Sequence, residues 1–126
     1  MREKFIEVAL DFEEIHIHHA QKISYGQEVE INPFFGDYEA IAPYIYNLPV
    51  GKKVPLHKHP TTDELFFIIK GRIKFKIGDK ELIATAGDVV KGKMNIPHSF
   101  ANVGDEPAAF LSVKAPKPVD LVMLEE

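Results

Sequence analysis

Two histidines and a glutamate stand close together near the middle of the chain. His57 and His59 are separated by one residue, so on a β-strand both imidazoles point to the same side. Glu64 follows the turn-prone stretch 60–63, which can bring its carboxylate back towards the imidazoles. Neighbouring nitrogen and carboxylate donors are what a divalent metal binds. A His-x-His pair by itself is more often an exposed or hydrogen-bonded structural pair than a metal site, so both interpretations stay open at this point.

A third histidine lies further along the chain. His98 stands at the predicted start of another strand, with Phe100 and Asn102 on the same face. Taken separately, His98 fits a buried or surface structural histidine as well as it fits a metal ligand. The order of residues around the three histidines decides between these interpretations.

Together the two clusters resemble the cupin superfamily. The first cupin motif is matched at every defined position, by Gly51, His57, His59, Glu64 and Gly71. The second motif is matched at Gly87, His98 and Asn102. Lys93 stands where the family has proline, and Asn95 where it has glycine. Because asparagine adopts a positive φ more readily than most residues, we expect the turn at Asn95 to survive this change.

The resemblance implies an all-β fold, the cupin double-stranded β-helix or jelly-roll barrel, with a metal inside near one mouth. By motif position the ligands are His57, His59, Glu64 and His98. Three imidazoles and a carboxylate suit one divalent transition metal per chain, and Mn, Fe, Ni, Cu and Zn all accept such a set. An octahedral ion with four protein ligands keeps two positions for water, dioxygen or a small-molecule ligand. The resemblance assigns no catalytic residue.

The elements that must position these residues are short strands. Proline and glycine divide residues 40–115 into pieces that suit strands better than helices. The segment 72–77 alternates, with Ile73 and Phe75 on one face and three cations on the other. We therefore predict a barrel over residues 38–115. An N-terminal extension, 1–37, is expected to pack on the barrel or on a partner subunit, and residues 116–126 form a C-terminal arm.

One strand departs from this alternation. Residues 65–69, Leu-Phe-Phe-Ile-Ile, are apolar on both faces, which predicts that both faces are covered. A small barrel covers only the inner face, so the outer face needs a second subunit or the N-terminal residues. We expect a homodimer, and the alternative is that residues 1–35 lie across this face.

Several other side chains have both a functional and a structural interpretation. Tyr44 and Tyr46 share a face and suit either a pocket wall or ordinary packing. An apolar shell around the metal is predicted from Phe66, Ile68 and Phe100. Cations flank the first cluster and suit either steering of an anionic ligand or a solvated rim: Lys52, Lys53 and Lys58.

A second group of histidines lies in the N-terminal extension. His16, His18 and His19 suggest a surface metal site, but no carboxylate or distant histidine has a spacing that supports it. A polar N-terminal strand or a dimer contact explains these residues better.

Composition sets the outer bounds on function. The chain has 126 residues, 45% hydrophobic and 27% charged, which suits a single globular domain. A net charge of −4 gives no basic footprint for nucleic acid. The absence of cysteine excludes disulfides, cysteine-based zinc sites and thiol nucleophiles. No stretch approaches the roughly 18–20 apolar residues of a membrane span, and residues 1–5 do not begin an apolar signal segment, so we expect a cytoplasmic location.

Three classes of function fit these observations unequally. The favoured one is a metal-dependent enzyme acting on a small oxygenated metabolite, with dioxygenation ahead of decarboxylation and isomerisation. A sugar-phosphate isomerase needs several cations inside the pocket to bind the phosphate. The outward direction predicted for Arg72, Lys74 and Lys76 therefore counts against an isomerase of this kind. The alternative is a non-catalytic module that binds or senses a small molecule. A storage role fits a single barrel with a full ligand set poorly.

Overall fold

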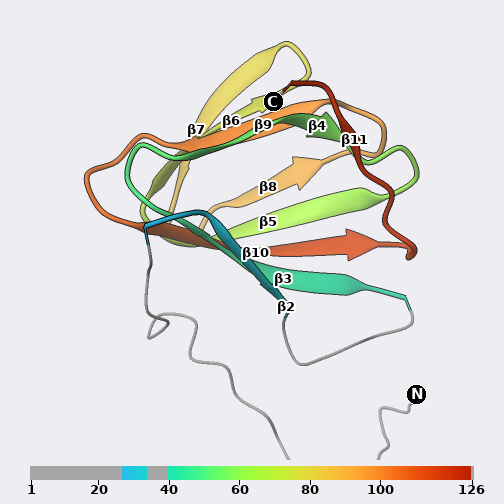
Figure 1. The fold of residues 1–126 in the computed structure, drawn as a ribbon, viewed down its shortest axis with the longest axis horizontal. Coiled ribbons are helices and arrows are strands. Elements are labelled where there is room, and N and C mark those ends of the chain that lie inside the picture. Colours follow the sequence, from blue (N-terminus) through green and yellow to red (C-terminus); the bar gives the residue numbers. More distant parts are fainter. Residues whose placement is uncertain (1–26, 34–39, 126) are drawn as a thin grey trace, which may run out of the picture.

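The computed structural model describes residues 27–33 and 40–125 of the chain. In this part every regular element is a β-strand, and the strands form two facing five-stranded sheets (Figure 1). All strand pairs are antiparallel. The predicted all-β jelly-roll architecture is thus confirmed.

The two sheets interleave strands that are distant in the sequence. The first sheet has the order β2 (Glu30–Pro33), β3 (Ala42–Leu48), β10 (Ala108–Ala115), β5 (Asp63–Lys70) and β8 (Val89–Gly92). The second sheet has the order β11 (Val122–Met123), β4 (Lys53–Lys58), β9 (His98–Asn102), β6 (Arg72–Ile77) and β7 (Lys80–Thr85). Except for β2–β3 and β6–β7, which pair within one sheet, successive strands lie in opposite sheets, so side chains from both sheets face the same interior.

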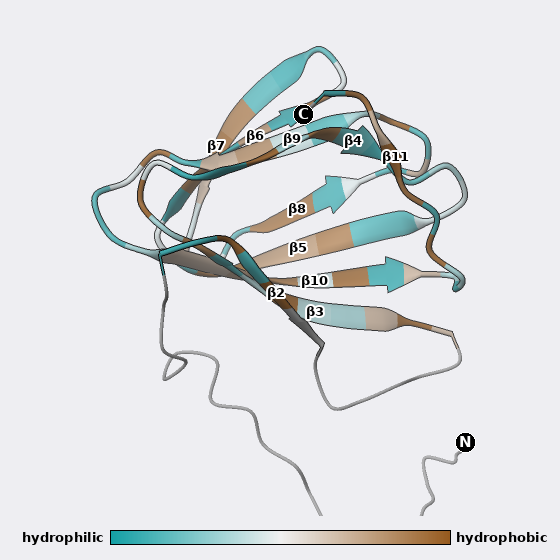
Figure 2. Ribbon diagram, in the orientation of Figure 1, coloured by the Kyte–Doolittle hydropathy of each residue, from teal (hydrophilic) through white to brown (hydrophobic). Residues whose placement is uncertain are grey.

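The core lies between the inner faces of the sheets. As predicted, Ile73 and Phe75 of β6 are buried, whereas Arg72 and Lys76 are exposed. Four phenylalanines fill the centre, with ring centroids 5.0–6.0 Å apart: Phe66, Phe75, Phe100 and Phe110. Figure 2 shows that β5 and β10 are hydrophobic over this core and hydrophilic at the end where β5 begins and β10 finishes. Polar side chains therefore gather at one end of the barrel.

Two motif positions have clear backbone reasons. Asn95 has a φ of 65°, so the expected left-handed turn is present with asparagine in place of glycine. At Gly71, with φ of 91°, an added Cβ would lie 2.6 Å from the Cβ of Ala108. Only glycine fits at this point, because the left-handed backbone and the neighbouring strand both exclude a side chain.

Both predicted flanking segments contribute a strand. From the predicted extension, β2 pairs with β3, and from the predicted arm, β11 pairs with β4. The division at residues 37/38 and 115/116 stays a prediction. His16, His18 and His19 lie outside the described residues. None of the described segments forms a helix long and apolar enough to cross a membrane.

The outer face of β5 is exposed in the described part of the chain. Leu65 is 51% exposed, Phe67 45% and the neighbouring Val89 of β8 61%. The described residues do not cover this face, so the predicted cover stays a prediction, and so does the homodimer.

We expect light scattering at micromolar concentration to give roughly twice the 14.2 kDa monomer mass. Replacing Phe67 by lysine places a charge in the proposed interface and should give the monomer mass. A monomeric wild-type protein would contradict the homodimer and favour the N-terminal residues as the cover.

Candidate metal centre

The four predicted ligand residues meet between the sheets. His57 lies near the end of β4, and His59 follows directly after that strand. Glu64 lies near the start of β5, and His98 is the first residue of β9. Ligand atoms of the three histidines all lie within 4.8 Å of one another. Glu64 Oε1 lies 3.5 Å from His59 Nε2 and 3.3 Å from His98 Nε2. All four side chains are buried.

Strand pairing and one turn produce this arrangement. His57 and His98 are opposite each other in the β4–β9 pair, which sets their rings 4.4 Å apart between centroids. The turn at residues 60–62 then carries the chain from the second sheet to the first, so Glu64 faces the histidines across the interior. The loop before β9 is tied to the same turn, because the Asn95 amide donates to the His59 carbonyl at 2.8 Å.

A backbone carbonyl orients each imidazole. The Nδ1 atoms of His57, His59 and His98 lie 2.7, 2.8 and 3.1 Å from the carbonyl oxygens of Pro55, Asp120 and Ile96, respectively. A carbonyl can only accept, so Nδ1 donates in each case. The neutral ring then carries its lone pair on Nε2, which is the usual arrangement of a metal-binding histidine.

The lone pairs that result face one another. His59 Nε2, His98 Nε2 and Glu64 Oε1 are buried, and no hydrogen-bond partner satisfies them in the described part of the chain. Burial lowers the pKa of His57 and His59, with smaller opposing effects from the carbonyls of Pro55 and Asp120. Neutral imidazoles and an ionised carboxylate directed at one point repel one another unless a proton or a metal cation lies between them, and metal binding displaces such a proton. The residues present therefore fit a divalent transition metal.

The second oxygen of Glu64 contacts two residues that the sequence analysis missed. Glu64 Oε2 accepts a hydrogen bond from the Ser112 hydroxyl and lies 3.2 Å from Lys114 Nζ. Burial raises the pKa of Glu64. Hydrogen bonding to His98, the charge of Lys114 and hydrogen bonding to Ser112 have the larger, opposite effect and lower this pKa to about 2. One signal was present in the sequence: Phe110, Ser112 and Lys114 share the inward face of β10, where polar residues are unusual.

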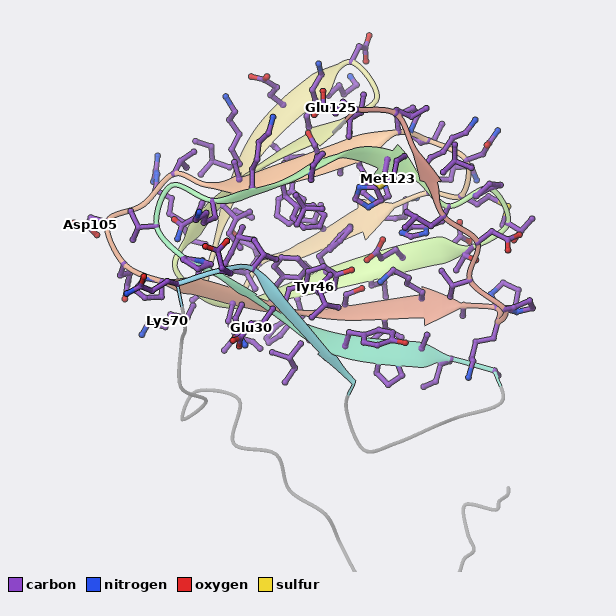
Figure 3. The ribbon with its side chains drawn as sticks, in the orientation of Figure 1. Glu30, Tyr46, Lys70, Asp105, Met123 and Glu125 are labelled. Carbon is purple, nitrogen blue, oxygen red and sulfur yellow. The ribbon has the colours of Figure 1, made fainter. Side chains whose placement is uncertain are left out.

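Lys114 connects the glutamate to the two tyrosines. Its ammonium donates to Tyr46 OH at 3.2 Å and lies 5.2 and 5.1 Å from the ring centroids of Tyr44 and Tyr46. Tyr46 also stacks on Phe110 at 4.7 Å, and Figure 3 shows it between the two sheets. Burial, with the charge of Glu64 and the neighbouring Tyr44, raises the pKa of Tyr46. Its hydroxyl consequently keeps its proton at neutral pH.

The other predicted site residues fall into an inner and an outer group. The inner group is buried and consists of Phe66, Ile68 and Phe100. The ring centroids of Phe66 and Phe100 lie 5.8 and 6.3 Å from that of His98. On the outer face of β6, Lys74 makes an ion pair with Glu81 at 3.7 Å. Two cations of the predicted rim also make ion pairs, Lys52 with Glu28 at 3.5 Å and Lys53 with Glu125 at 3.6 Å. Such exposed pairs fit the interpretation of these lysines as a solvated rim.

The C-terminal arm reaches the site along the free edge of β4. Its strand β11 pairs Met123 with His57, and the amide of Leu124 donates to the Leu56 carbonyl at 2.9 Å. Leu56 in turn donates its amide to the Glu125 carboxylate at 2.9 Å. Figure 3 shows Met123 and Glu125 on the side of the second sheet. The arm thus holds the Asp120 carbonyl against His59.

Removing the arm should weaken metal binding without removing a ligand. In a chain that ends at Pro116, His59 loses the carbonyl that orients it, and loss of such an outer partner typically costs ~10–100-fold in metal affinity. The measurement is a competition titration of Mn²⁺ or Zn²⁺ against a chelator. A Glu125→Gln variant, which keeps the arm and the Asp120 carbonyl, is the matched control and should bind metal as the wild type does. Equal affinity of the shortened and full chains would contradict the role of the arm.

The fold and the centre together define a double-stranded β-helix barrel with a histidine-rich metal-type site between its sheets. The chain belongs to the cupin domain family, whose model matches residues 44–114.

Individual relatives agree with this assignment. Over 66 residues the chain is 36% identical to the oxalate-binding protein of Thermotoga maritima. This match covers 52% of this chain and 54% of that protein. Over 69 residues it is 32% identical to the uncharacterized protein MJ1618 of Methanocaldococcus jannaschii, covering 55% of each. The matches span about half the length of the curated relatives.

Solved structures share the fold. A conserved protein from Klebsiella pneumoniae with a double-stranded β-helix domain superposes with a TM-score of 0.78 at 22% identity, covering 90% of this chain and all of that one. A Thermotoga maritima structure described as a predicted oxalate decarboxylase gives a TM-score of 0.59 at 32% identity, covering 63% of this chain and 69% of that one.

Proposed function

We propose that this cupin holds one divalent transition metal through His57, His59, His98 and Glu64 and acts with it on a small oxygen-donor acid. The observation that carries the proposal is the set of buried acceptors without partners in the described part of the chain, His59 Nε2, His98 Nε2 and Glu64 Oε1. When bound, a metal of this kind supplies a Lewis acid with open positions for an oxygen ligand.

The residues around the four ligands have separate tasks in this proposal. The backbone carbonyls keep the imidazoles in one tautomer, so the donor atoms are organised before any ion arrives. Phe66 and Phe100 exclude water beside His98, which strengthens electrostatic interactions at the site. Tyr46 keeps its proton, so its hydroxyl can donate a hydrogen bond to an anionic ligand and does not serve as a base.

The relatives indicate the first ligand to test. One is named an oxalate-binding protein and another is described as a predicted oxalate decarboxylase. Both names support a small dicarboxylic acid as the ligand class. They fit decarboxylation within the enzyme interpretation, and the first also fits the alternative of a module that binds its ligand without turnover. Dioxygenation remains part of the proposal, because the same open positions accept dioxygen.

The proposal is tested with the full chain stripped of metal and reloaded with Mn²⁺, Fe²⁺ or Zn²⁺ in turn. We expect close to one equivalent of bound metal and metal-dependent binding of oxalate by calorimetry. Release of CO₂ with an equal amount of formate and no oxygen uptake then identifies a decarboxylase, oxygen uptake identifies an oxygen-dependent enzyme, and binding without either identifies a binding module. A chain that takes up none of these metals would overturn the proposal.

A further inference from the structure

A buried lysine stands directly behind the proposed ligand Glu64. Lys114 is only 4% exposed and is paired in register with Glu64 across β10 and β5. Its ammonium has three acceptors: Glu64 Oε2 at 3.2 Å, Ser112 Oγ at 3.0 Å and Tyr46 OH at 3.2 Å. Two of its N–H groups are in hydrogen bonds, to Ser112 and Tyr46, and the ammonium pairs with the Glu64 carboxylate, so its polar contacts are directed at Glu64 and the groups behind it.

This lysine changes the charge of the site. Apart from the histidines and Tyr46, which keeps its proton, Glu64 and Lys114 are the ionisable side chains that are buried in the described part of the chain. With neutral imidazoles, the carboxylate alone would give the donor set one negative charge. The adjacent ammonium cancels that charge, so ligands and lysine together are neutral.

We propose that Lys114 sets the charge of the metal centre and thereby makes it selective for small dianions over monoanions. This inference rests on the proposed function and names the ligand class of the same site. With Glu64 neutralised by Lys114, a bound divalent ion keeps its full double charge within an apolar shell. A ligand with two negative charges balances this charge, whereas a monoanion leaves half of it unbalanced.

The same geometry carries a cost for metal binding. A cation 3.2 Å from one oxygen of Glu64 repels a second cation at the other oxygen. Lys114 thus weakens metal binding and strengthens dianion binding, and it acts through Glu64 and its field. It is a specificity-determining residue that does not touch the ligand. A lysine that only held Glu64 in place would strengthen metal binding, and this opposite sign separates the two roles.

The test replaces the charge and keeps the volume. In Lys114→Met, we expect the Mn²⁺ dissociation constant, measured by chelator competition, to fall by ~10–100-fold. In the Mn²⁺-loaded protein, the preference for oxalate over formate, measured by calorimetry, should fall by a similar factor. Lys114→Gln keeps polar contacts to Glu64 and Tyr46 without the charge. It should show the same fall in the Mn²⁺ dissociation constant and the same fall in the preference for oxalate. It replaces the methionine variant in the test if that variant does not fold.

Ser112→Ala is the matched control, because it removes the other donor to Glu64 Oε2 without changing any charge. It should leave the oxalate-to-formate preference unchanged and should not tighten Mn²⁺ binding. Weaker Mn²⁺ binding in both Lys114 variants, or an unchanged oxalate-to-formate preference, would overturn this inference alone. Failure of the wild-type chain to take up metal would instead overturn the proposed function.

Discussion

The double variant His57→Ala, His98→Ala should lose its bound metal while keeping the barrel. The two side chains are register partners on β4 and β9, and each offers an Nε2 lone pair to the same point. Since loss of a single outer partner already costs ~10–100-fold in metal affinity, removal of two ligands should cost well over 100-fold. Elemental analysis after dialysis should fall from about one equivalent to background, and circular dichroism should still show the β-sheet spectrum.

The N-terminal histidines provide the control for this experiment. A His16→Ala, His18→Ala variant removes the same number of imidazoles from the other histidine-rich segment of the sequence. It should keep the full equivalent of metal. A folded His57/His98 variant that retained its metal would show that these residues are not the ligands, and loss of metal in the N-terminal variant would point to that segment.

The ligand cluster could be predicted because its residues match the two cupin motifs, and the spacing within the first motif is local. His57, His59 and Glu64 lie on one strand, the turn after it and the start of the next strand, so the strand period and the turn determine where they point. The turn at Asn95 was predictable for a similar reason, since few residues accept a φ of 65° and asparagine is one of them. The fold followed from the same motifs and from the glycine and proline boundaries.

The groups that hold the ligands in place could not be predicted, because their positions depend on pairing between strands that are distant in the sequence. Lys114 reaches Glu64 only through the register of β10 on β5, which no local pattern specifies. The group that orients His59 is a backbone carbonyl at Asp120, and a carbonyl has no residue type to recognise. The strand β11 that brings it there has two residues, too few to show a period. Outside the site, the apolar outer face of β5 predicts a cover without identifying it.

Breaking the Glu64–Lys114 pair should have the largest effect on stability. In the metal-free protein, Glu64→Leu leaves a buried ammonium without its counter-ion, and Lys114→Met leaves a buried carboxylate. Loss of one partner of a buried pair typically costs ~3–5 kcal/mol of unfolding free energy. Replacing both by apolar residues of similar volume removes both charges, so the double variant should be more stable than the sum of the single effects predicts. Urea denaturation at pH 7 after metal removal measures all four proteins.

The pH dependence supplies a check on the carboxylate of that pair, whose pKa is lowered first by hydrogen bonding to His98 and then by the charge of Lys114. The pKa of Glu64 is lowered from its ordinary 4.5 to about 2 in the folded protein, so its carboxylate stabilises the fold above pH 4.5. That contribution is lost as the pH falls from 4.5 towards 2, because the unfolded chain binds the proton first. The loss of unfolding free energy in Glu64→Leu relative to wild type should therefore be smaller at pH 3 than at pH 7. Ser112→Ala, which keeps both charges but removes hydrogen bonds to them, should cost ~1.5–3 kcal/mol at pH 7. Additive single and double variants, or a deficit that stays constant with pH, would mean that the pair does not stabilise the barrel.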